Sequence, residues 1–187
     1  MSLKVWALKP GELKPLDRDG LLIFTALCAL RVEEWIPPEA HARFTAALTA
    51  VVDHAAVGAA PPADVPALAR ELSDLGATAS HARASVDEPV GRCHNYALLT
   101  AAIALQLIPV ADRPTIVKRV IVAAKHAGSI PALLANAGRV IAPAGHDPVD
   151  FACTQFWDAR RADVVRVVAQ RAALRAASDR LAALRAL

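Results

Sequence analysis

Proline and glycine divide this 187-residue chain into alanine-rich apolar segments that are long enough for helices and lack the pattern of strands. No segment shows convincing alternation of apolar and polar residues, and only 3–8 (LKVWAL) could form a short strand. An apolar fraction of 55% excludes a disordered chain, because burial can offset the entropy lost on ordering. The three widely spaced cysteines exclude a disulfide scaffold. We therefore expect one all-α domain over residues 1–187, with six or seven helices in antiparallel hairpins.

The same breaks predict where each helix begins and ends. In the first half, helices are expected over 17–35, 37–57 and 64–83, with a linker at 58–64. In the second half they are expected over 92–108, 114–128 and 131–141, after a polar loop at 84–91 that could mark a sub-boundary. The segment 147–150 (DPVD) supplies a capping aspartate and a first-turn proline. Nothing breaks the pattern after it, so the last helix is expected to run about 40 residues to Leu187, roughly 60 Å.

Charge is distributed unevenly along the chain. Residues 1–112 carry 9 basic and 13 acidic side chains, whereas residues 113–187 carry 12 and 5. The modest net charge of +3 therefore divides into a weakly acidic part of −4 and a basic part of +7.

The arginines of the last helix form the candidate interaction surface. They are Arg160, Arg166, Arg171, Arg175, Arg180 and Arg185. Val167, Leu174 and Leu181 lie seven residues apart, as the core positions of a coiled coil do. Because arginine is enriched at interfaces, we expect this helix to bind a protein partner or a second copy of the chain. The alternative is a helix that packs along its own domain with solvated arginines.

Non-specific binding of nucleic acid through the same basic part is a third hypothesis. The arginines step by four or five residues, so they turn around the helix instead of lining one face. No aromatic residue follows Trp157. These features leave binding to the phosphate backbone as a hypothesis and do not support recognition of a base sequence.

Two polar clusters are weak candidates for catalytic or ligand-binding residues. Cys93 and His94 stand at the expected start of the helix over 92–108, where the positive end of the helix would lower a thiol pKa. His146 lies one turn before Asp150, which could orient it or share a metal with it. If these side chains converge, they would line a pocket between helices. The alternative is a buried cysteine beside capping and surface residues.

Spacings typical of metal sites are absent from the sequence. It contains no HxxxH, HExxH or CxxC, and no phosphate-binding loop or nucleophile elbow. We therefore expect no metal site and no cofactor.

The start of the chain and its amino-acid composition indicate the compartment. Residues 1–15 lack an apolar stretch long enough for a signal peptide. A membrane span needs about 20 apolar residues, and every apolar run in the sequence is shorter. Sixteen arginines against five lysines, with abundant alanine, are typical of GC-rich bacterial genomes. We expect a bacterial cytoplasmic protein with no membrane association.

Missing catalytic motifs, the divided charge and the heptad positions together favour a non-catalytic helical interaction protein. Such a protein would be an adaptor, an immunity-like protein or a partner subunit of a larger complex. An enzyme or small-ligand-binding protein with a pocket near Cys93, His94, His146 and Asp150 is the second hypothesis.

Overall fold

The structure, a computed structural model, describes residues 7–84 and 86–187, and within these ranges it contains seven α-helices and no strand. The helices are α1 (Arg18–Leu30), α2 (His41–Val57), α3 (Val65–Arg83), α4 (Glu88–Gln106), α5 (Arg113–Asn136), α6 (Pro148–Ala176) and α7 (Arg180–Arg185). Three short 3₁₀ turns accompany them: η1 (Pro10–Leu13), η2 (Glu33–Trp35) and η3 (Pro38–Ala40). The all-α fold predicted from the sequence is confirmed. The strand considered for 3–8 falls mostly outside the described residues.

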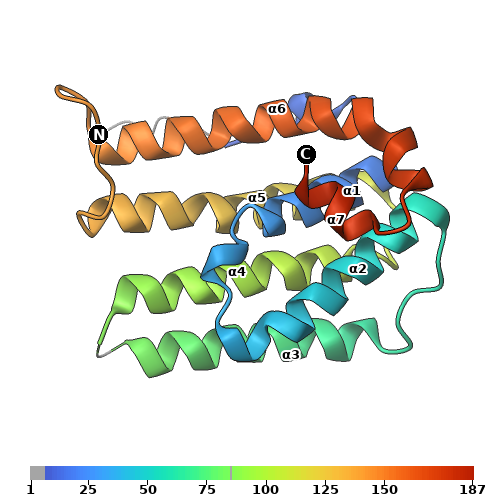
Figure 1. Cartoon of the computed structure of the whole chain (residues 1–187), viewed down its shortest axis with the longest axis horizontal. Helices are drawn as coiled ribbons and strands as arrows, with labels where there is room; N and C mark the ends of the chain where they lie inside the picture. Colours follow the sequence, from blue (N-terminus) through green and yellow to red (C-terminus); the bar gives the residue numbers. More distant parts are fainter. Residues whose placement is uncertain (1–6, 85) are drawn as a thin grey trace.

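Four long helices form a row that follows the order of the chain. In Figure 1, α3, α4, α5 and α6 lie one above another, each antiparallel to the next. Helix α1 packs against α4, α5 and α6, and α2 packs against α1 and α4. Helix α1 is the centre of the core, because every side chain of its middle turns, from Leu21 to Ala29, is buried. The α3 and α6 helices end the row, so each has a side that no other long helix of the row covers.

Aspartates begin most of these helices by accepting a hydrogen bond from a first-turn amide. Asp64 accepts from the amide of Ala67 at 2.8 Å, and Asp147 accepts from that of Asp150 at 2.8 Å, as the sequence predicts. Asp87 does the same for α4, with a proline in the first turn. Helix α4 therefore begins at Glu88, four residues before the predicted start.

The two helices predicted over 114–128 and 131–141 are one helix, α5. Pro131 lies inside it and removes one backbone hydrogen bond, at a cost of about 3 kcal/mol. Burial of Gly128 and Ile130 in the turn before Pro131, with Gly128 against α6, offsets that cost. The helix ends where Gly138 adopts φ +71° and the amide of Arg139 donates to the carbonyl of Leu134 at 2.8 Å.

The single helix of about 40 residues predicted for the C-terminus is wrong. Helix α6 ends at Ala176, and Asp179 begins α7 by accepting from the amide of Ala182 at 2.9 Å. Helix α7 folds back so that Leu181 and Leu184 are buried against the rest of the chain. The predicted coiled-coil positions therefore do not continue beyond Leu174. The next of them, Leu181, belongs to α7 and is buried within the same molecule.

Close packing of α3 and α4 generates a prediction about Gly91. A Cβ on Gly91 would lie 2.9 Å from the carbonyl oxygen of Ser80 and 2.8 Å from the Cβ of Arg83. Alanine normally stabilises a helix by about 1 kcal/mol relative to glycine. Here Gly91→Ala is expected to lower the free energy of unfolding by about 1–3 kcal/mol, because the helices must separate.

Urea unfolding measures this change, with Gly11→Ala as the matched control. No atom lies within 4 Å of a Cβ on Gly11, so that variant should stay within about 0.5 kcal/mol of the parent. A Gly91→Ala protein as stable as the parent would show that α3 and α4 are not in close contact.

Candidate functional site

Cys93 is a buried core residue in the second turn of α4. The helix begins at Glu88, so the free amides of its first turn lie before Cys93. Burial raises the pKa of the Cys93 thiol to about 11, with smaller effects from Arg139 and Asp87. The expectation that a helix start lowers this pKa is wrong, because the earlier start of α4 moves Cys93 into the interior.

His94 and His146 have different surroundings. His94 is partly buried on α4, and its Nδ1 has no hydrogen-bond partner among the described residues. Burial lowers the pKa of His94, and so does the charge of Arg83, while Glu39 acts in the opposite direction. His146 is exposed in the loop before α6 and meets the ring of Phe151 edge-on, with the centroids 6.3 Å apart.

Asp150 lies in the first turn of α6 and belongs to the surroundings of Cys153. Burial raises the pKa of the Cys153 thiol, and the charges of Asp150 and Asp147 raise it further. Helix α5 lies between α4, which carries Cys93 and His94, and α6 (Figure 1). Helix α5 therefore separates the helix that carries Cys93 and His94 from the helix that carries Asp150.

Burial of the cysteines predicts slow alkylation of the folded protein. Cys28, Cys93 and Cys153 are all buried, and burial raises the pKa of Cys28 to about 12. Because the thiolate is the reactive form, iodoacetamide at neutral pH should leave all three unmodified while the protein is folded. Mass spectrometry before and after addition of urea measures this. Rapid modification of Cys93 in the folded protein would restore it as a candidate nucleophile.

The C-terminal arginines that the sequence singled out are mostly used inside the molecule. Arginines of α6 and α7 form ion pairs with carboxylates of residues 12–53. The pairs are Arg161 with Glu12, Arg171 with Asp17 and Asp19, Arg180 with Asp53, and Arg185 with Glu33. The divided charge of the chain is therefore an internal complementarity between its two ends.

Asp163 is the most buried of these charged groups. Its carboxylate is fully inaccessible and accepts from Arg160 at 2.8 Å, from Arg166 at 2.8 Å and from Arg31, the C-cap residue of α1, at 3.1 Å. The guanidinium of Arg160 also lies 4.9 Å from the centre of the Phe156 ring. Arg160 is only 4% exposed, so it is not available to a partner.

Removal of the Asp163 charge is expected to be strongly destabilising. Asp163→Asn leaves three arginines around a neutral amide, and breaking a buried ion pair costs about 3–5 kcal/mol. The control is Asp158→Asn, whose side chain is 66% exposed and whose ion pair with Arg161 is worth under about 1 kcal/mol. Thermal unfolding of both variants measures this difference in stability. Equal stability of the two would show that Asp163 does not hold α6 in place.

The outward side of α6 carries an apolar stripe that the sequence analysis missed. Val165 and Val168 are 67% and 47% exposed. Ala169, Ala172 and Ala176 are exposed on the same side at helical spacing. These five residues are called the α6 stripe below. The spacing of these five residues in the sequence is a signal for the stripe. The heptad residues of the same helix lie on the opposite side.

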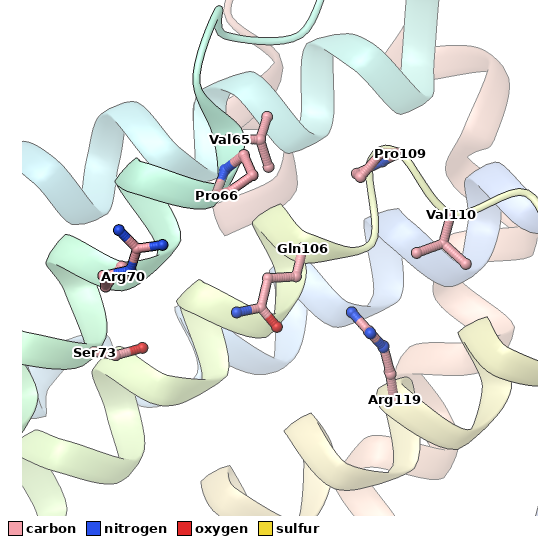
Figure 2. A pocket seen from close by; sticks show the side chains of 8 residues that line it. All are labelled: Val65, Pro66, Arg70, Ser73, Gln106, Pro109, Val110 and Arg119. Atoms are coloured by element: carbon pink, nitrogen blue, oxygen red, sulfur yellow. The ribbon is translucent and has the colours of Figure 1, made fainter.

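A second surface feature is a groove of about 580 Å³ between α3, α4 and α5. Its polar lining consists of Arg70 and Ser73 of α3, Gln106 of α4 and Arg119 of α5. Figure 2 shows Gln106 between the two arginines, with the apolar wall formed by Val65, Pro66, Pro109 and Val110. We call it the arginine groove. No local sequence pattern indicates this groove, because its residues come from three separate segments of the chain.

Comparison with known protein families, with curated proteins and with solved structures finds no match. A function for this chain is therefore inferred from its own geometry. In residues 7–84 and 86–187 there is no group of three or more His, Cys, Asp or Glu side chains placed to hold a metal ion. None of the helices in the same ranges combines the length and hydropathy that crossing a bilayer requires.

Proposed function

We propose that this chain is a non-catalytic helical interaction protein that binds another protein through the α6 stripe. The observation that carries the proposal is the exposure of two valines, Val165 and Val168, beside three exposed alanines on one helix face. A patch of this kind costs free energy in water unless a partner covers it. Small alanine side chains also allow the backbone of a partner helix to approach closely.

Charge around the α6 stripe indicates the chemistry of the partner. Arg166 and Arg175 flank the stripe, and both are at least partly exposed. A second copy packed on this face would bring arginines close to arginines, which is unfavourable. The occupant that fits is a different protein with an apolar helix bordered by carboxylates.

Burial and pairing of the remaining C-terminal arginines reduce the support for nucleic-acid binding. Arg171, Arg180 and Arg185 each have carboxylate partners within the chain, and phosphates would have to compete with these. The enzyme hypothesis has less support, because burial raises the pKa of the Cys93 thiol to about 11 and so favours its protonated form at neutral pH.

Photo-crosslinking in the cells that make the protein tests the proposal. A benzophenone amino acid replaces Val165 in one variant and Val122, which is 45% exposed on α5, in the control. Val165 should crosslink to one defined polypeptide that the control does not capture. Val168→Glu should abolish that crosslink and leave the thermal unfolding temperature nearly unchanged, since the side chain is at the surface.

Two results would contradict the proposal. The first is an absence of crosslinks at Val165, and the second is the same set of products at Val165 and Val122. A crosslink from Val165 to a second copy of the chain would also reject a different protein as the partner.

A further inference from the structure

We propose that the arginine groove binds a small-molecule oxyanion, a phosphate or a carboxylate attached to an apolar body. The site is separate from the α6 stripe and does not depend on the protein partner proposed above. The groove combines arginines that have no ion-pair partner among the described residues, an apolar wall held by hydrogen bonds, and a volume suited to a small molecule.

Arg70 and Arg119 differ from most arginines of this chain. Neither forms an ion pair with any residue in the described part of the chain, although both line the same groove. Glu71, the neighbour of Arg70 in sequence, is held by Arg43 of α2 at 2.8 Å. The carboxylate nearest in sequence is thereby removed from competition, and no acidic side chain lines the groove.

Asp74 is the carboxylate that remains in the neighbourhood of Arg70. It lies one turn further along α3, where it lines an adjacent shallow hollow together with Arg70. Arg70 therefore borders both the groove and this adjacent hollow. Removal of the Asp74 charge should favour the side that faces the groove.

The wall of the groove is braced from behind by Arg18 of α1. Its guanidinium donates to the carbonyl of Ile108 at 2.6 Å and to that of Val110 at 3.2 Å. These bonds tie the segment that contains Pro109 to the core helix. The apolar wall is therefore formed before a ligand arrives, which reduces the entropy lost on binding.

The polar groups of the groove match an oxyanion. Guanidinium groups donate two parallel hydrogen bonds to phosphate or carboxylate oxygens, and the side-chain amide of Gln106 adds another donor. The hydroxyl of Ser73 donates to the carbonyl of Ala69 at 2.9 Å, so Ser73 is not one of the donors to the oxyanion. A volume of about 580 Å³ falls in the range of small-molecule pockets and exceeds the size of a bare phosphate.

Nuclear magnetic resonance of the arginine side chains tests the site directly. Inorganic pyrophosphate and succinate are titrated separately into the full chain, and the Nε signals of Arg70 and Arg119 are followed. Both signals should shift and saturate with at least one of the two anions. Saturation by pyrophosphate alone identifies a phosphate ligand, and saturation by succinate alone identifies a carboxylate ligand.

Single variants separate the groove from general surface charge. Arg70→Gln and Arg119→Gln should each weaken binding about tenfold, the usual loss for one charge-assisted hydrogen-bonded group. Asp74→Asn should strengthen it. The matched control is Arg83→Gln, which removes the same charge from the exposed C-terminal end of α3 and should change affinity less than twofold.

The proposal is overturned if neither anion shifts the two signals at millimolar concentration. It is also overturned if Arg83→Gln weakens binding as much as Arg119→Gln does, since the effect would then be net charge alone. The four side chains changed in these variants lie at the surface, so the variants are expected to fold, and circular dichroism verifies this.

Discussion

Asp163 is inaccessible to solvent, and its two oxygens accept from three arginines: Arg160 and Arg166 of α6, and Arg31 at the C-cap of α1. A carboxylate in this position is tolerated only while those donors are in place, because an unpaired buried charge is very costly. The bond from Arg31 is the critical one, since it joins the last long helix to the central helix α1. The position of α6, and with it the direction in which the α6 stripe faces, depends on this cluster.

The ion pairs around that cluster explain why the chain is acidic at one end and basic at the other. Carboxylates on η1, α1, η2 and α2 meet arginines on α6 and α7, so that two segments far apart in sequence close the fold around the core. Each exposed pair contributes little by itself, but together they favour one register of α6 against the N-terminal part. Two surfaces that these pairs do not use are the apolar face of α6 and the arginine groove.

Those two remaining surfaces differ in what they can recognise. The α6 stripe is apolar and convex, and it suits a helix of another protein. The arginine groove is concave and positively charged, and it suits a small anion. They lie on different helices, α6 for the stripe and α3 to α5 for the groove, so a ligand in one need not displace a partner from the other.

The sequence by itself determined the fold class and most helix starts, because apolar periodicity, proline breaks and capping aspartates are local signals. Asp64 and Asp147 act as predicted for that reason. The tertiary structure alone decided that Pro131 stays inside α5, where packing on α6 offsets a lost hydrogen bond, and that the chain turns after Ala176 to bury Leu181. It also decided which charges are free, because the partner of Arg171 is more than 150 residues away in sequence and no pattern in the chain records that distance. Arg70 and Arg119 were assembled in the same way, by the packing of three helices.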